Sequence, residues 1–118
     1  MTFRVPDVKG YQPIEDPIST LSAYDSPLQT GIPLSVVLEE FKNHSQSSGD
    51  QSLVSISTDP GRYLCNFIYY KALLHQHSRA LPLNSLFIHV PSFDVISKDQ
   101  QVEIIQRIIT SICTICLQ

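Results

Sequence analysis

Residues 53–68 read LVSISTDPGRYLCNFI. The first five of them form an apolar run rich in β-branched side chains, which is typical of a short, largely buried strand. The next four, Thr-Asp-Pro-Gly at 58–61, predict a turn. From about Arg62 to about His77 an apolar stripe persists at helical spacing. We therefore predict a strand, a tight turn and a helix, in that order.

The same order of elements continues toward the C-terminus. Residues 85–90, Ser-Leu-Phe-Ile-His-Val, form a second apolar run, which Pro91 ends. Ser97 is suited to a helix N-cap because Gln100 follows it at capping-box spacing, and the helix that follows carries an apolar set: Val102, Ile104, Ile105, Ile108, Ile109 and Ile112. Two apolar strands joined through a helix indicate adjacent parallel strands covered on both faces. The predicted fold class is therefore α/β, a partial three-layer α/β/α arrangement.

The N-terminal part of the sequence differs in character. We predict that residues 1–32 form an irregular surface segment, with a short strand or hairpin near Phe3–Val5, because prolines and glycines interrupt it: Pro6, Gly10, Pro13, Pro17, Pro27 and Gly31. Pro33 suits the first turn of a helix that should run to about Asn43. Residues 44–51 are polar and are predicted to be a loop.

The composition limits the classes of function. A chain of 118 residues forms one domain at most, and its 42% apolar and 16% charged residues suit a folded protein. A net charge of −3 with scattered Lys and Arg argues against a nucleic-acid binder. No apolar stretch approaches the roughly 18 residues of a membrane span, and the N-terminus does not resemble a signal peptide. The three cysteines favour a reducing compartment, so a cytoplasmic protein is expected.

Cys65 lies in the opening turn of the helix predicted after the Thr-Asp-Pro-Gly turn. Unpaired backbone N–H groups and the helix dipole favour an anion at that position. A thiolate is therefore favoured there, and the same N–H groups could bind the oxyanion of a tetrahedral intermediate. The alternative, which position alone leaves open, is that Cys65 is a small buried apolar residue.

His89 is the second candidate, since a titratable side chain is unusual near the end of an apolar strand. A core histidine bonded to a backbone carbonyl is the alternative interpretation. In parallel sheets, functional sites lie beyond the carboxyl ends of the strands, and both His89 and Cys65 are placed toward that end. Together they have the chemistry of a Cys/His nucleophile pair.

Four segments, in order along the chain, resemble pyroglutamyl peptidase I, also called pyrrolidone-carboxylate peptidase. Residues 57–70 (STDPGRYLCNFIYY) are similar to the family's nucleophile motif Ser-x-x-Ala-Gly-x-Tyr/Phe-x-Cys-Asn-x-x-x-Tyr, with Pro60 in place of alanine. Residues 86–91 (LFIHVP) resemble its Phe-Ile/Val-His-Val-Pro motif, which carries the catalytic histidine. Residues 4–13 and 30–33 resemble its Arg-Ile-Pro-Asp-x-x-Gly-x-x-Pro loop and its Thr-x-Leu-Pro helix start.

The resemblance implies a cysteine peptidase that removes N-terminal pyroglutamyl residues from peptides through a thioester. Cys65 would be the nucleophile and His89 the general base and acid. Leu64 and Asn66 would contribute to the substrate pocket and the oxyanion contacts. The resemblance implies no metal and no cofactor, and its partner is a pyroglutamyl peptide rather than a nucleic acid or a membrane; association with further copies of the chain is left open.

Family members also have an upstream glutamate that orients the histidine, and an upstream loop that supplies aromatic walls for the pyroglutamyl ring. No residue of this sequence matches either feature, because its candidate acids fall in other segments: Glu15, Glu39 and Glu40. We therefore expect residues 1–118 to be a single, N-terminally truncated domain that lacks the family's N-terminal strands. The alternative function is a catalytically inactive fragment or paralogue that acts as an interaction module.

The remaining residue groups favour structural interpretations. Cys113 and Cys116 have redox or metal spacing, but their isoleucine neighbours indicate a buried helix face, so dithiol redox chemistry is a third hypothesis only. His75 and His77 are expected at a helix end, where cations suit the dipole. Three tyrosines fit a partly buried helix face: Tyr63, Tyr69 and Tyr70. Three acidic residues are expected to be solvated: Asp94, Asp99 and Glu103.

Overall fold

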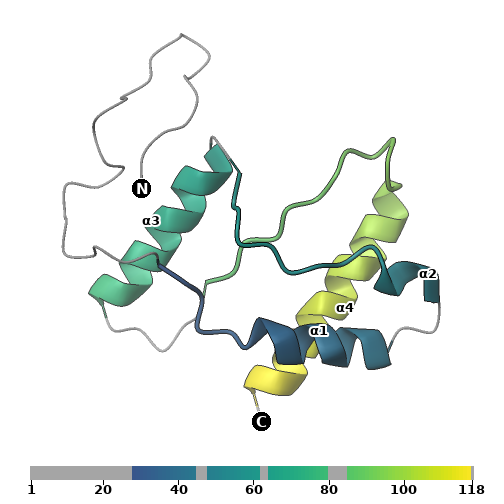
Figure 1. Cartoon of the computed structure of the whole chain (residues 1–118), viewed down its shortest axis with the longest axis horizontal. Helices are drawn as coiled ribbons and strands as arrows, with labels where there is room; N and C mark the ends of the chain where they lie inside the picture. Colours follow the sequence, from purple (N-terminus) through teal and green to yellow (C-terminus); the bar gives the residue numbers. More distant parts are fainter. Residues whose placement is uncertain (1–27, 45–47, 62–63, 80–84, 118) are drawn as a thin grey trace, which may run out of the picture. The chain divides into compact units, whose positions relative to one another are not determined.

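The computed structural model describes residues 28–44, 48–61, 64–79 and 85–117. Within these ranges lie four helices (Figure 1): α1 (Leu34–Asn43), α2 (Ser48–Gln51), α3 (Leu64–Ser78) and α4 (Lys98–Cys116). The chain divides into two compact units. The first comprises Met1–Gly31 and Asp59–Phe87 and contains α3; the second comprises Ile32–Thr58 and Ile88–Gln118 and contains α1, α2 and α4. None of the helices in the described part is long and apolar enough to cross a membrane.

The predicted α/β class with adjacent parallel strands is wrong for the described residues, none of which lies in a strand. The runs 53–57 and 85–90 do not form strands of a sheet, and several of their apolar side chains are exposed: Leu53, Ile56, Ile88 and Val90. An apolar, β-branched run favours extended backbone, but a strand also needs a neighbour that pairs with its N–H and C=O groups. The sequence pattern favoured extended backbone, but it could not indicate whether a neighbouring strand would pair with it.

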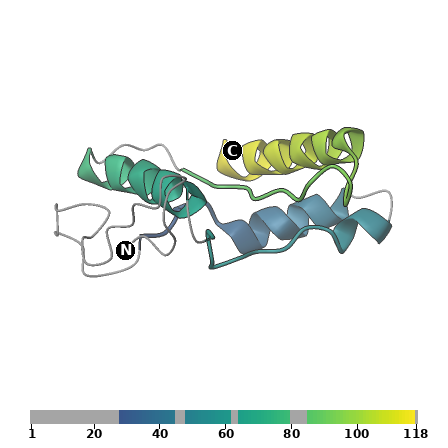
Figure 2. The same ribbon diagram turned by 90° about the horizontal axis from the view of Figure 1, so that it is seen from above.

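In the second unit, α1 and α4 pack directly against each other, and Figure 2 shows them side by side. Their contact buries Phe41 of α1 against Ile104 and Ile108 of α4, with Val54 packed at the edge of this cluster. Phe41 is only 1% exposed. The apolar residues of each helix recur at three- and four-residue spacing, which places them on one face. The second unit therefore has a helix-on-helix core where a helix-on-sheet core was expected.

The start of α4 confirms the predicted cap. Ser97 is the N-cap residue, and its hydroxyl oxygen accepts a hydrogen bond from the backbone N–H of Gln100 at 3.4 Å. The buried side chain of Gln101 then donates to the backbone oxygens of Pro91 and Ile96, at 2.9 and 2.8 Å. These bonds fasten the 91–96 loop to the first turn of α4.

The helix predicted near 33–43 is confirmed as α1, with Pro33 at its N-cap position. Residues 48–51, predicted to be part of a polar loop, form the short helix α2. The Asp50 carboxylate of α2 pairs with Arg107 of α4 at 3.0 Å, an interaction that the sequence did not suggest. Most of the 1–32 segment, the motif at 4–13 and the predicted loop at 81–84 lie outside the described residues.

In the first unit, α3 confirms the helix predicted from about Arg62 to His77. The segment after it lies against this helix, because the Gln76 side-chain oxygen accepts a hydrogen bond from the Ser85 backbone N–H at 2.8 Å. The rings of Tyr69 and Phe87 lie 5.9 Å apart, centroid to centroid. Leu73 and Leu74 are the buried apolar residues of α3. Tyr69 and Tyr70 are half-buried, as predicted, and burial raises the pKa of Tyr69.

Candidate active site

The turn that leads into α3 is set by Asp59 and Gly61. The Asp59 carboxylate accepts a hydrogen bond from the Gly61 backbone N–H at 3.0 Å, which closes an Asx turn. Gly61 has a φ of +95°, a backbone conformation that residues other than glycine rarely adopt. The Thr-Asp-Pro-Gly sequence thus produces the predicted sharp turn, and α3 begins three residues after Gly61.

Cys65 is the second residue of α3, so the structure places it in the first helical turn as the sequence predicted. Its thiol is free and partly exposed. The first turn of α3 contains no acidic side chain that would oppose a thiolate. Because the first N–H groups of a helix lack intrahelical partners, this turn has the donors and the dipole direction that favour a negative charge. Cys65 is neither fully buried nor fully exposed, so its role as a nucleophile stays a prediction.

The two neighbours of Cys65 have opposite environments. Leu64 is 55% exposed, whereas Asn66 is 2% exposed. Polar side chains buried to that degree are usually hydrogen-bonded in native proteins. Leu64 is accordingly available to touch a ligand on the surface, and Asn66 is available to fix the start of the helix from within.

His89 lies in the extended segment between Phe87 and the 91–96 loop, and its side chain is exposed. It belongs to the second unit, whereas Cys65, Leu64 and Asn66 belong to the first. The imidazole of His89 is thus not buried in the second unit. The pairing of His89 with Cys65 stays a prediction.

Cys113 and Cys116 lie at the end of α4, and both are exposed, so the predicted buried face is wrong for them. The prediction relied on the isoleucines beside the two cysteines. The buried residues of α4 instead form a narrow stripe next to the face that carries the cysteines: Ile104, Ile108 and Ser111. Among the residues that the structure describes, no three His, Cys, Asp or Glu side chains come together in a way that could hold a metal ion.

The other polar groups lie where the sequence predicted. His75 and His77 are exposed in the last turn of α3. Asp94, Asp99 and Glu103 are exposed. A hydrogen bond from the Ser92 side chain, and a second from the backbone of Asp94 itself, lower the pKa of the Asp94 carboxyl.

Comparison with known proteins places these residues in context. The profile of the family described as "Pyroglutamyl peptidase" matches residues 1–114. The pyrrolidone-carboxylate peptidase of Thermococcus litoralis is 32% identical over 90 residues, which are 75% of this chain and 36% of that protein. Pyrrolidone-carboxylate peptidase 2 of Caldanaerobacter subterraneus is 34% identical over 92 residues, 78% of this chain and 41% of that protein.

A shorter match is closer in sequence. Human pyroglutamyl-peptidase 1 is 53% identical over 38 residues, which cover 32% of this chain and 16% of that protein. The chain spans less than half the length of each of these three relatives. No solved structure matches the chain significantly.

Proposed function

Because the chain belongs to the pyroglutamyl peptidase family, we propose that it hydrolyses the peptide bond that follows an N-terminal pyroglutamyl residue. The observation that carries the proposal is the position of Cys65. A family match over residues 1–114 coincides with a free, partly exposed thiol in the first turn of α3, directly after a constrained turn. That is the environment in which cysteine acts as a nucleophile.

In the first step, the Cys65 sulfur attacks the carbonyl carbon of the pyroglutamyl residue. The negative charge that develops on the carbonyl oxygen is stabilised by backbone N–H groups in the first turn of α3. Such donors contribute about 2.7–4 kcal/mol each where their removal has been measured in other enzymes. The C–N bond then breaks, the shortened peptide leaves as an amine, and the pyroglutamyl group remains on sulfur as a thioester.

His89 is the proposed proton carrier. As a base it takes the thiol proton of Cys65, and as an acid it gives that proton to the leaving amine. In the second step it takes a proton from water, whose oxygen attacks the thioester carbon. The C–S bond then breaks, pyroglutamic acid leaves, and His89 returns the proton to the Cys65 sulfur. An imidazole suits both roles because its ordinary pKa of about 6.5 lies near neutral pH.

Leu64 and Asn66 are proposed to shape the site on either side of the nucleophile. The exposed Leu64 side chain supports a role as an apolar contact for the pyroglutamyl ring. The buried Asn66 side chain supports a role in holding the first turn of α3 in place, so that its N–H groups stay directed at the oxyanion.

The thioester tests this mechanism directly. The full chain is mixed with a pyroglutamyl ester, quenched in acid and digested with a protease. The mass of each cysteine-containing peptide is then measured by mass spectrometry. We expect one pyroglutamyl adduct, on Cys65. An adduct on Cys113 or Cys116 at the same level would show nonspecific acylation of exposed thiols, and absence of any adduct during turnover would contradict the covalent mechanism.

A second candidate function is an inactive interaction module, favoured by the exposure of Phe93 and Val95. These side chains are 65% and 69% exposed and lie two residues apart in the loop before α4. Large exposed apolar groups that lie close together are typical of contact surfaces. This candidate predicts no hydrolysis of any pyroglutamyl substrate and no difference between wild-type chain and Cys65→Ser.

A further inference from the structure

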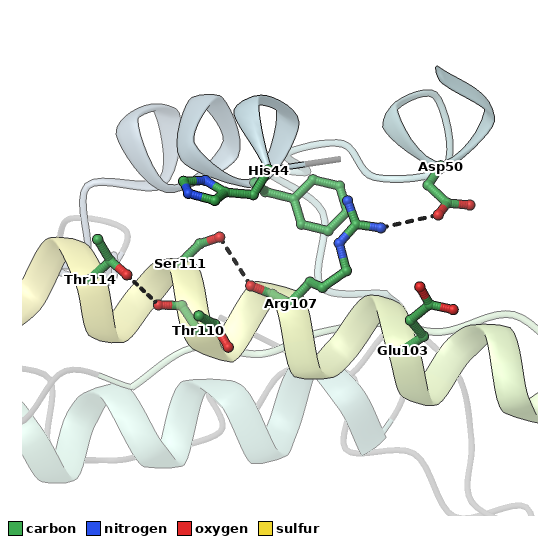
Figure 3. A pocket seen from close by; sticks show the side chains of 8 residues that line it. His44, Asp50, Glu103, Arg107, Thr110, Ser111 and Thr114 are labelled. Atoms are coloured by element: carbon green, nitrogen blue, oxygen red, sulfur yellow. Dashed lines mark hydrogen bonds and ion pairs between the residues drawn. The ribbon is translucent and has the colours of Figure 1, made fainter. Parts of the chain in front are cut away.

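A hollow of about 370 Å³ opens between α1, α2 and α4, entirely within the second unit (Figure 3). Its volume is in the range of sites that hold small molecules. Phe41 forms its apolar back, and the residues around it are polar or charged. None of these residues takes part in the proposed peptidase mechanism, so the hollow is a separate feature of the molecule.

Three hydroxyl groups on α4 line one end of the hollow, and all of them donate to their own helix. Thr110 donates to the Gln106 carbonyl at 2.9 Å, Ser111 to the Arg107 carbonyl at 3.0 Å, and Thr114 to the Thr110 carbonyl at 2.9 Å. A hydroxyl has a single proton. Since each proton is engaged, the oxygens present lone pairs to the hollow and act there as hydrogen-bond acceptors.

His44 extends the same pattern from the end of α1. Its Nδ1 lies 3.0 Å from the Glu40 backbone carbonyl oxygen and 3.3 Å from the Glu40 carboxylate, and both oxygens can only accept. In the neutral tautomer that fits these contacts the proton is on Nδ1, and Nε2 is then an acceptor. Figure 3 shows His44 across from Ser111 and Thr114, so this end of the hollow is surrounded by acceptors from both helices.

The opposite end of the hollow is acidic. Arg107 is held by Asp50 at 3.0 Å and lies over the Phe41 ring at 4.7 Å from its centroid. The other Asp50 oxygen accepts from the Gln100 side chain at 3.4 Å. Glu103 also lines the hollow and is exposed. With Asp50 and Glu103 negative and Arg107 positive, the formal charges of the lining residues at this end sum to −1.

We propose that this hollow binds a small aliphatic amine that carries an ammonium at one end and a hydrogen-bond donor at the other. The ammonium pairs with Glu103, and the far donor meets the acceptors at Thr110, Thr114 and His44. Glu103 and Thr110 are two turns apart, about 10 Å along the helix axis. An extended four-carbon chain with a hydrogen bond at each end spans about that distance. The proposal goes beyond the peptidase function and does not depend on it.

Aminobutanol, with its ammonium and hydroxyl at opposite ends, is the probe for this site. The full chain, labelled with ¹⁵N, is titrated at low ionic strength, and amide shifts are followed by NMR. Butanediol and hydroxybutyrate are titrated in parallel, because they keep the chain length and change the head group to a neutral or an anionic one. We expect saturable shifts on α1 and α4 around Phe41 and Thr110 with aminobutanol alone.

Glu103→Gln should weaken aminobutanol binding about two- to fivefold, the range expected for a single exposed ion pair. The matched control is Glu39→Gln on α1, which removes the same charge from a residue that does not line the hollow and should leave binding unchanged. Saturation by hydroxybutyrate in place of aminobutanol, equal binding of butanediol, or equal weakening by the two glutamine variants would each overturn the proposal. So would shifts that never saturate.

Discussion

Gly61 lies against Cys65, since a β-carbon added to Gly61 would stand 3.6 Å from the Cβ of Cys65. That distance is an ordinary van der Waals contact, so the space at Gly61 does not require a glycine. The backbone does, because its φ of +95° is rarely adopted by other residues. The Asx turn from Asp59 to Gly61 thus constrains the backbone just before α3, and with it the position of the Cys65 thiol.

Gly61→Ala should destabilise the protein by about 1–2 kcal/mol, the cost of forcing an L-residue into left-handed backbone. Urea unfolding followed by circular dichroism measures this loss. Gly49→Ala is the matched control, because Gly49 lies in helical backbone in α2 and alanine favours a helix by up to about 1 kcal/mol. If both variants unfold at the same urea concentration as wild type, the turn is not a constraint.

The helices were largely predictable because their signals are local. The apolar spacing in α4, the Ser97 cap and the Pro33 helix start depend on residues within one or two turns of each other. The strands at 53–57 and 85–90 were not predictable in the same way. Their apolar runs favour extended backbone, whereas sheet formation depends on distant partners, and here Val54 packs against the α1–α4 cluster instead.

The candidate site also combines a feature set by local sequence with one that depends on distant residues. The position of Cys65 follows from the turn and the helix start, both of which can be read within residues 58–66, and the structure agrees with that prediction. The predicted pairing of Cys65 with His89 would depend on contacts between remote segments, which no local pattern encodes. The pairing of Asp50 with Arg107, 57 residues apart, was missed for the same reason.

His89→Gln should reduce the rate of pyroglutamyl amide hydrolysis about 10²- to 10⁴-fold, the usual contribution of a general base. Glutamine keeps a polar side chain of similar size and cannot carry a proton near neutral pH. His75→Gln, at the exposed end of α3, is the control and should keep the wild-type rate. A His89→Gln rate within twofold of wild type would remove His89 from the mechanism.

Ser97→Ala should destabilise the second unit by about 0.5–1 kcal/mol, the lower part of the range for N-cap removal. The low value is expected because the cap hydrogen bond is long, at 3.4 Å. The free energy of unfolding in urea is the measurement. Ser35→Ala, at an exposed position inside α1, should cost nothing, since alanine is the better helix former. Equal stability of the two variants would show that the cap contributes nothing.

Ser92→Ala should raise the pKa of the Asp94 carboxyl toward its ordinary value of 3.8, because the Ser92 hydroxyl is the main group that lowers it. The folded-state pKa lies below the unfolded one, so the charged carboxylate favours folding above about pH 4, and this contribution is lost as the pH falls through the folded-state pKa. An NMR titration of the Asp94 side chain measures the shift. The control Ser55→Ala should leave the Asp94 pKa at its wild-type value. An Asp94 pKa in Ser92→Ala equal to that in the control would contradict the assignment.

The central claim is that Cys65 is the nucleophile of a pyroglutamyl peptidase. Release of a fluorescent amine from a pyroglutamyl amide, measured for the full chain, for Cys65→Ser and for Cys113→Ser, tests it most directly. We predict steady release by the wild-type chain and by Cys113→Ser, whose thiol is exposed at the far end of α4, and a loss of at least about 10³-fold in Cys65→Ser. No release by the wild-type chain, or equal release by Cys65→Ser, would contradict the claim.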